Sequence, residues 1–188
     1  TELVNGSINV NGETCYLSEQ PFMIEDSIYQ NIVMGKPHDK DRYDLVLEVS
    51  GLKALLTDMD EGDSMVLKDD AVNISKKTQK LICLARALYR DYDIYLIDQF
   101  FDDYSKLEVQ EALRTIFSTV LCDKTVISTT RQIESCREYD LIIVMNEGRI
   151  VQTGTFYDLM NNKHGIFNAM FFLKSHEESQ YEIERNEP

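Results

Sequence analysis

The chain has 188 residues and carries 33 acidic against 19 basic side chains, a formal net charge of −14. This balance argues against a nucleic-acid partner, because the sequence offers no basic stripe that could neutralise phosphates. The longest apolar run, Leu141–Met145, is far too short to cross a bilayer, and the chain opens with no secretory signal.

The first third of the chain predicts a hairpin followed by helices. Ser7–Val10 and Thr14–Leu17 alternate around Asn11-Gly12, which is good turn chemistry for a short β-hairpin. Ser27–Met34 has the pattern of a helical turn that ends before a glycine and a proline. Apolar residues at positions 45, 46, 49, 52 and 56 predict one helix over Asp41–Leu56.

The segment Ile74–Gln99 predicts an amphipathic helix, a turn and a buried strand. One helical face is apolar, because apolar side chains recur there at helical spacing. The run Ile94–Ile97 is continuously apolar, which is typical of a strand covered on both faces of a parallel sheet. Such a strand delivers Asp98 to the carboxyl edge of the sheet, where open α/β folds bind ligands. An acid in that place often holds a Mg²⁺ ion on a nucleotide phosphate.

The remaining segments alternate between helix and strand patterns, which predicts an α/β fold with a mainly parallel sheet. Lys106–Val120 is a predicted helix in which Leu107, Val109, Leu113, Ile116 and Phe117 point inward. The predicted strands are Thr125–Thr129 and Leu141–Met145, and the predicted helical segments are Ile133–Arg137, Phe156–Asn161 and Phe167–Phe172. Four scattered cysteines without C-x-x-C spacing are expected to be reduced apolar fillers in a cytosolic protein.

Several of these segments carry motifs. The helix contains Leu84-Ala85-Arg86-Ala87, followed by the strand that ends in Asp98. Upstream stands Tyr16-Leu17-Ser18-Glu19, then Pro21-Phe22-Met23 and the run from Asp26 to Gly35 that contains Ser-Ile-x-x-Asn-Ile. At these residues, over Ser7 to about Lys174, the chain resembles the nucleotide-binding domain of ATP-binding-cassette (ABC) transporters. It looks most like the first such domain of the C branch, the multidrug-resistance and cystic-fibrosis conductance proteins.

The resemblance implies an ABC-type nucleotide-binding domain over residues 1–174, with a parallel sheet core, a helical subdomain and an incomplete N-terminus. Residues 175–188 form an acidic tail, expected to be a flexible linker. The implied role is to couple ATP binding to export at the cytoplasmic face of a membrane. The implied cofactors are ATP and Mg²⁺ in a complete domain. The implied partners are the transporter's transmembrane domain and a second nucleotide-binding domain.

Most positions that match the family's catalytic motifs are altered. The Walker B acid is retained as Asp98, but the catalytic glutamate that should follow it is Gln99. A neutral amide cannot accept a proton, so a general-base contribution of about 10²–10⁴-fold is lost. The Q-loop glutamine is replaced by Glu19, which could ligate Mg²⁺ together with Asp98. The D-loop aspartate is Ser105.

The switch histidine of the family is replaced by Arg131. Arginine can contact a phosphate as a fixed cation, but it cannot orient a water by accepting a hydrogen bond. An exposed arginine in a salt bridge at a helix start is the alternative interpretation of this residue. For Gln99 the alternative is a plain polar residue at a strand end.

The signature motif departs most from the family pattern. Where the family has Ser-Gly-Gly-Gln, this chain has Ser75-Lys76-Lys77-Thr78. The glycines let backbone N–H groups at a helix N-terminus approach a γ-phosphate, and side chains at 76 and 77 obstruct that approach. Two lysines there also oppose the helix dipole, at about 0.3–1 kcal/mol each. They either face an anion or an acidic partner surface, or extend into water.

No G-x-x-x-x-G-K-(S/T) phosphate loop occurs in the 188 residues. In the family this loop lies just before the strand that matches Ser7–Val10, so we expect a larger polypeptide with the loop upstream. The whole pattern predicts a domain that is impaired in hydrolysis and inactive on its own. A former ATPase domain kept as an interaction scaffold is the alternative, and an active ATPase that uses Asp98 with an unrecognised base is a third.

A docking groove for the membrane domain is also expected. The resemblance places it between the segment Phe22–Met34 and the helical subdomain Asp41–Leu56. Phe22, Met23, Ile24 and Ile28 are expected to line it as an exposed apolar patch, which needs a partner to be tolerated.

Overall fold

A computed structural model describes residues 5–68 and 71–173 of the chain. The chain divides into two compact units. The first holds the residues up to Asp103 together with Arg114–Thr130, and the second holds Tyr104–Leu113 and the residues from Arg131 onward. In the described ranges, no helix combines the length and the apolar character that crossing a membrane requires. The predicted acidic tail from 175 onward lies outside the described residues.

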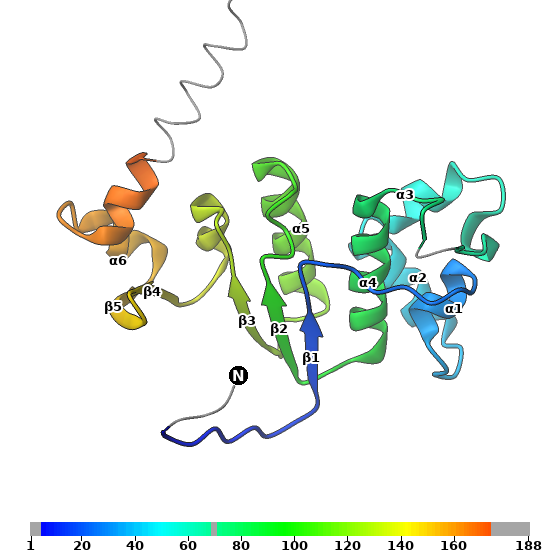
Figure 1. Ribbon diagram of the computed structural model, residues 1–188, viewed down its shortest axis with the longest axis horizontal. Coiled ribbons are helices and arrows are strands. Elements are labelled where there is room, and N and C mark those ends of the chain that lie inside the picture. Colours follow the sequence, from blue (N-terminus) through cyan, green and yellow to red (C-terminus); the bar gives the residue numbers. More distant parts are fainter. Residues whose placement is uncertain (1–4, 69–70, 174–188) are drawn as a thin grey trace, which may run out of the picture. The chain divides into compact units, whose positions relative to one another are not determined.

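The first unit is built on a three-stranded parallel sheet. Its strands are β1 (Thr14–Leu17), β2 (Ile94–Asp98) and β3 (Thr125–Thr129), in the order β1-β2-β3 (Figure 1). Leu17 is in register with Ile97, and Asp98 is in register with Thr129. The carboxyl ends of the three strands therefore meet at one edge of the sheet, as predicted for a parallel α/β fold.

One face of this sheet is buried and the other is largely open. Tyr95 and Ile97 of β2 are buried, at 1% and 4% exposure. On the other face, Tyr16, Leu96 and Ile127 stand side by side, because Leu96 is in register with both neighbours. Tyr16 is 61% exposed and Ile127 is 59% exposed. The prediction that β2 is covered on both faces is therefore wrong for the Leu96 face in the described structure.

The predicted hairpin before β1 is also wrong. Residues 7–13 are irregular and exposed, and β1 pairs with β2 in parallel rather than with the preceding residues. A type I′ turn needs positive φ at both central residues. Gly12 has φ 125°, but Asn11 is not among the positive-φ residues, so this turn does not form. The path is set instead by Asp93, whose carboxylate accepts a 2.8 Å hydrogen bond from the N–H of Glu13.

Three short helices follow β1. α1 (Ile28–Val33) begins at Ser27, whose hydroxyl accepts the N–H of Gln30, and ends at Met34 in the left-handed conformation. α2 (Lys40–Val49) and α3 (Leu52–Thr57) occupy the range predicted as one helix. The chain breaks between them at Gly51, which has φ 75°, a conformation that interrupts a right-handed helix and suits glycine. The single-helix prediction was therefore wrong.

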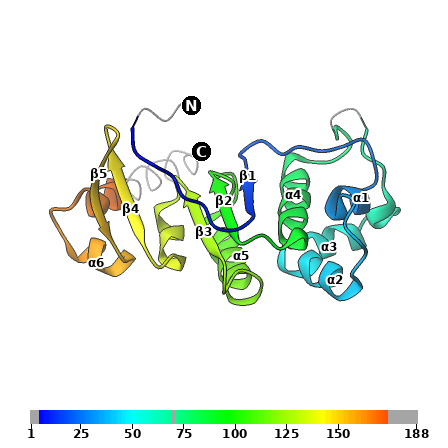
Figure 2. The ribbon, with the colours of Figure 1, turned by 90° about the horizontal axis from the view of Figure 1, so that it is seen from below.

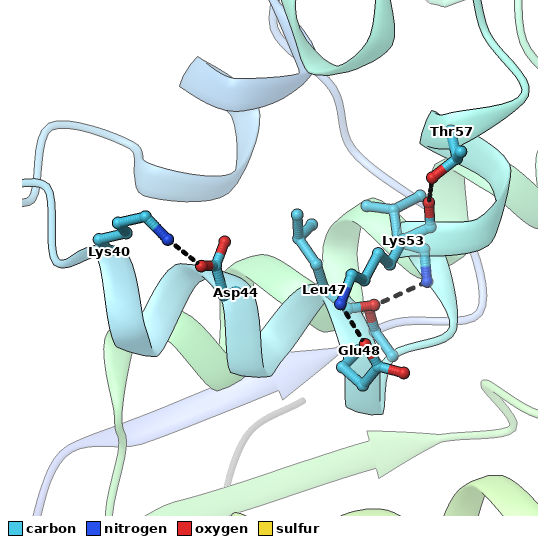
Figure 3. Close-up of polar contacts among 8 residues, drawn as sticks. Lys40, Asp44, Leu47, Glu48, Lys53 and Thr57 are labelled. Atoms are coloured by element: carbon cyan, nitrogen blue, oxygen red, sulfur yellow. Dashed lines mark hydrogen bonds and ion pairs between the residues drawn. The ribbon is translucent and has the colours of Figure 1, made fainter.

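Two exposed ion pairs involve side chains of α2 and α3 (Figure 3). Lys40 reaches Asp44 at 2.5 Å, one turn along the same helix, and Lys53 reaches Glu48 at 2.6 Å. Because all four side chains are more than half exposed, water screens both pairs and they add little to stability. Leu45 is also 44% exposed, so its place in the predicted apolar pattern did not make it a core residue.

The longest helix, α4 (Lys76–Arg90), carries the apolar face that the sequence predicts, and α1, α2 and α3 pack against it (Figure 2). The contact is fully buried, at 0% exposure for Ile28, Ile32, Val46, Leu52, Ile82 and Leu88. Arg42 of α2 closes the end of α4 by donating to the carbonyl oxygens of Leu88 and Tyr89. These orphan carbonyls are thereby satisfied.

Helix α5 (Lys106–Thr119) follows β2. Val109, Leu113 and Ile116 are buried as predicted, at 1–2% exposure. Leu107 was expected to point inward, but it is 78% exposed. It lies in the first turn of the helix, two residues before the buried Val109 and so on a different face.

The second unit contains a 3₁₀ segment, η2 (Ile133–Glu138), and an antiparallel ribbon of β4 (Ile142–Asn146) and β5 (Arg149–Gly154). α6 (Phe156–Asn161) packs on this ribbon (Figure 2), and a further helix spans 166–173. The core of this unit consists of six buried apolar residues, Ile133, Ile142, Val144, Phe156, Leu159 and Phe167.

Candidate functional site

The carboxyl edge of the parallel sheet brings two hydroxyl side chains to the carboxylate of Asp98. Thr129, at the end of β3, donates its hydroxyl to Oδ1 of Asp98 at 2.5 Å. Tyr16 of β1 donates its hydroxyl to Oδ2 at 2.9 Å. The carboxylate is thus held by both neighbouring strands, which fixes its direction at the edge where parallel α/β sheets bind ligands.

The hydrogen bonds favour the charged form of this carboxylate. The Thr129 hydroxyl and, to a smaller extent, the Tyr16 hydroxyl hold the pKa of Asp98 below its usual value, although partial desolvation opposes them. The hydrogen bond between Tyr16 and Asp98 also raises the pKa of the Tyr16 hydroxyl. The folded-state pKa of Asp98 lies below the unfolded value, so its stabilising contribution is present above about pH 4. That contribution is lost as the pH falls through the lowered pKa.

We expect Thr129→Val to raise the pKa of Asp98 towards its usual value, and Tyr16→Phe to raise it by a smaller amount. The reason is that each change removes one donor from the carboxylate and leaves the other in place. NMR titration of the Asp98 side-chain carboxyl carbon in the three proteins measures this directly. Ser128→Ala is the matched control, because the Ser128 hydroxyl is directed to the Thr129 carbonyl and not to Asp98. An unchanged pKa in Thr129→Val would contradict the assigned hydrogen bond.

Gln99 follows Asp98 in an unusual backbone conformation. Its φ is 46°, which non-glycine residues rarely adopt. The N–H of Gln99 donates to the carbonyl oxygen of Thr129 at 3.0 Å and also lies 3.2 Å from the Thr129 hydroxyl. The turn after β2 is therefore tied to β3, and it presents residue 99 just beyond the acid. Strained positions of this kind are frequent at functional sites.

The other predicted metal ligand, Glu19, lies two residues beyond the end of β1 and is exposed. Among the described residues, no group of three or more His, Cys, Asp or Glu side chains is arranged to hold a metal ion. Asp98 is the one acid that the structure fixes at the sheet edge by hydrogen bonds from both neighbouring strands. The pairing of Asp98 and Glu19 around Mg²⁺ stays a prediction.

The altered signature forms the N-terminus of α4. Ser75 is the N-cap residue, and its hydroxyl accepts the N–H of Thr78 at 3.1 Å and lies 2.9 Å from the Thr78 hydroxyl. Thr78 is buried, at 6% exposure, whereas Lys76 and Lys77 are exposed in the first turn. Of the four residues predicted at the signature, Ser75 and Thr78 therefore cap the helix, whereas Lys76 and Lys77 lie on its surface.

A buried lysine links α4 to the segment that follows Asp98. Lys80 is 4% exposed, and its ammonium donates to the carbonyl oxygen of Phe100 at 3.1 Å and to Asp103 at 2.7 Å. The charge also lies 5.7 Å from the centre of the Phe100 ring. The backbone after Gln99 is therefore attached to the helix that carries the signature positions.

Arg86 of α4 fixes the segment that follows Glu19. It donates to the carbonyl oxygen of Asn31 at 2.6 Å, to the side-chain oxygen of Asn31 at 3.0 Å and to the carbonyl oxygen of Phe22 at 2.9 Å. Asn31 is fully buried, and its side-chain amide also binds the backbone of Ile24. It accepts the N–H of Ile24 at 2.9 Å and donates to the carbonyl oxygen of Ile24 at 3.0 Å. Arg86 of the Leu-Ala-Arg-Ala motif and Asn31 of the Ser-Ile-x-x-Asn-Ile motif are thus joined by hydrogen bonds.

Arg131, the residue at the histidine position, begins the second part of the second unit, whereas Asp98 and Gln99 belong to the first. Its side chain is exposed. Its role at the phosphate site stays a prediction.

Sequence reasoning missed the partners of Asp98 and the link through Lys80. Tyr16 and Thr129 stood inside recognised motif segments, but neither was given a role. The signal was available, since both are hydroxyl-bearing residues at the ends of strands that flank β2. Lys80 gave no such signal, because a lysine in an amphipathic helix is usually exposed.

Comparison with known proteins gives the family. No family model matches the chain. The chain is 37% identical to "ABC transporter C family member 3" of Arabidopsis thaliana over 159 residues, which covers 85% of this chain and 10% of that protein. It is 32% identical to "ATP-binding cassette sub-family C member 4" of Homo sapiens over 180 residues, which covers 94% of this chain and 13% of that protein.

The chain is a homologue of the C-family ABC transporters. It spans about a tenth of the length of these relatives. A solved bacterial Atm1-family ABC exporter with ATP bound shares its fold, with a TM-score of 0.78 and 19% identity over 87% of this chain and 29% of the exporter chain. The prediction of an ABC-type nucleotide-binding fold of the C-family type is therefore confirmed.

Proposed function

We propose that the chain is part of a nucleotide-binding domain of a C-family ABC exporter, on the cytoplasmic face of a membrane. In this role it couples ATP binding to transport, and its own Asp98 site is impaired in hydrolysis. The observation that carries the proposal is Asp98 itself, held at the carboxyl edge of the sheet by Tyr16 and Thr129 and followed by Gln99. The homology to C-family transporters supports it.

The site fits a Mg²⁺-nucleotide only in part. Asp98 is ionised and oriented, so it would supply a carboxylate to a Mg²⁺ ion. The Gln99 side chain is an amide and would not accept the proton of an attacking water. The metal would neutralise phosphate charge when bound. The chain's own residues at this edge would position the metal and leave the water without a base.

A groove on the same unit is suited to docking the membrane domain. Its volume is about 370 Å³, and it is lined by the whole of β1, by Phe22 and by the α4 side chains Cys83, Arg86 and Arg90. We call it the β1–α4 groove. Phe22 is 64% exposed, while Ile28, which was expected to share the patch, is fully buried in the helical core. We therefore propose docking in the groove beside β1 and α4, which neither α2 nor α3 lines.

The docking role predicts a specific failure in the Phe22→Asp variant of the full-length transporter. Phe22 is exposed, so the change should shift the melting temperature of the nucleotide-binding domain by no more than about 2 °C. Assembly or surface expression of the transporter should fall severalfold, because a carboxylate replaces an apolar anchor in the docking groove. Val72→Asp is the matched control, since Val72 is 76% exposed and does not line this groove. Normal assembly of the Phe22→Asp transporter would refute docking here.

A further inference from the structure

Two arginines line the β1–α4 groove, and within the described part of the chain neither has an acidic partner. Arg86 and Arg90 stand one turn apart on α4 and both line the groove. Among residues 5–68 and 71–173, neither guanidinium forms an ion pair with a carboxylate, and all their described hydrogen bonds run to backbone carbonyls, Asn31, Met23 and the Tyr92 hydroxyl. This is unusual in a chain with 33 acidic residues against 19 basic ones.

The acid adjacent to the pair in sequence is directed elsewhere. Asp91 lies 3.2 Å from Arg42 and 3.1 Å from Lys124, so its carboxylate pairs with these two cations and not with Arg90 in the described structure. Burial lowers the pKa of Arg86, and the positive charge of the neighbouring Arg90 also acts to lower it. Two like charges at i and i+4 destabilise a helix unless an anion compensates them.

Arg90 is prepared for an incoming anion. Its Nε donates to the Tyr92 hydroxyl at 2.8 Å, and its guanidinium lies 6.0 Å from the centre of the Tyr92 ring. One remaining contact, to the carbonyl oxygen of Met34, is 3.3 Å long. The side chain is therefore held in place while donors of its planar fork remain available. A fixed arginine binds a carboxylate with less loss of side-chain entropy than a free one.

The rest of the groove combines apolar and thiol side chains with the polar side chains of Thr14, Tyr16, Ser18, Gln20 and Tyr92. Phe22, Leu17, Ala87 and the thiols of Cys15 and Cys83 line it, and burial raises the pKa of the Cys15 thiol to about 11, so that it is neutral. A small free anion would leave this apolar surface exposed. A protein segment that carries one carboxylate next to apolar side chains would cover the surface and neutralise the arginines together.

We infer that the membrane-domain segment that docks in the β1–α4 groove carries an Asp or Glu, and that its carboxylate pairs with Arg90 beside Arg86. This inference rests on the proposed function, because it specifies the chemistry of the docking partner. Electrostatic pairing of this kind fixes the register of a docked segment, whereas the apolar contact with Phe22 supplies area.

The test is charge reversal in the full-length transporter. Arg90→Glu should lower the assembled fraction at least about fivefold, because it places a carboxylate against the partner's carboxylate. Arg90→Gln, which keeps a donor and removes the charge, should have a smaller effect. Arg149→Glu is the matched control, because Arg149 is exposed on β5 and does not line the groove. This substitution changes the net charge by the same amount as Arg90→Glu.

The partner acid is then found by rescue. Each Asp and Glu of the cytoplasmic loops is changed to Arg in the Arg90→Glu background, and one reversal should restore assembly. Unaltered assembly of Arg90→Glu, or the failure of every reversal, overturns the inference. If Phe22→Asp still blocks assembly in that case, docking in the groove stands and only the acidic contact is wrong. If Phe22→Asp is also without effect, the proposed docking itself fails.

Discussion

Arg86→Met should destabilise the first unit by about 3 kcal/mol or more. The change removes three hydrogen bonds from a charged donor to oxygen acceptors, two of them on the fully buried Asn31. Each hydrogen bond that involves a charged group contributes about 1.5–3 kcal/mol. Because Asn31 also holds Ile24, the whole segment from Phe22 to Asn31 should loosen.

The measurement is urea unfolding of the nucleotide-binding domain, followed by circular dichroism, for three variants. Arg86→Lys should recover little, since an ammonium cannot reproduce the planar fork that reaches both Asn31 and Phe22. Arg90→Met is the matched control one turn along α4, and it should cost no more than about 1 kcal/mol because Arg90 makes fewer hydrogen bonds than Arg86. Equal losses for Arg86→Met and Arg90→Met would contradict the central role of Arg86.

Phe156→Ala should cost the second unit about 3–5 kcal/mol, the usual range for a buried aromatic. Phe156 is 4% exposed and packs edge-on against Phe167, with the ring centres 5.7 Å apart. The guanidinium of Arg137 lies 4.7 Å from its ring centre and loses that contact as well.

Its neighbour Tyr157 supplies the control. Tyr157 is 71% exposed, so Tyr157→Ala should change the free energy of unfolding by no more than about 0.5 kcal/mol. Hydrogen exchange of the amides of β4 and β5 would show the difference between the two variants locally. Similar amide protection of β4 and β5 in Phe156→Ala and in the wild type would mean that the packing of Phe156 is not central to the core of this unit.

The sequence was a good guide to elements whose cause is local. The 3.6-residue pattern located α4, and the β-branched and apolar runs located β2, β3 and β4 close to their observed bounds. Failures came where one residue outweighed the pattern. Gly51 divides a predicted helix into α2 and α3, and Asn11 does not adopt the φ that the predicted hairpin needs.

The site was predictable in its position but not in its contacts. An apolar run followed by an acid was enough to predict from the sequence that Asp98 lies at the sheet edge. The register between strands, which brings Tyr16 and Thr129 to the same carboxylate, depends on long-range pairing that no local pattern encodes. Ile28 was wrongly expected on an exposed patch for a similar reason, because it reads as a surface apolar residue until α1 is packed against α4.

The most direct test of the proposed function follows a nucleotide at the Asp98 site of the full-length transporter. Photoreactive azido-ATP, labelled on either the α- or the γ-phosphate, is incubated with Mg²⁺ at 37 °C, cross-linked, and traced to the peptide fragments of this domain. If Gln99 stands in place of the general base, as proposed, the domain should retain both labels equally, and Asp98→Ala should reduce both. Loss of the γ-label while the α-label stays would show that the site hydrolyses ATP, and labelling independent of Asp98 would show that this acid holds no Mg²⁺-nucleotide.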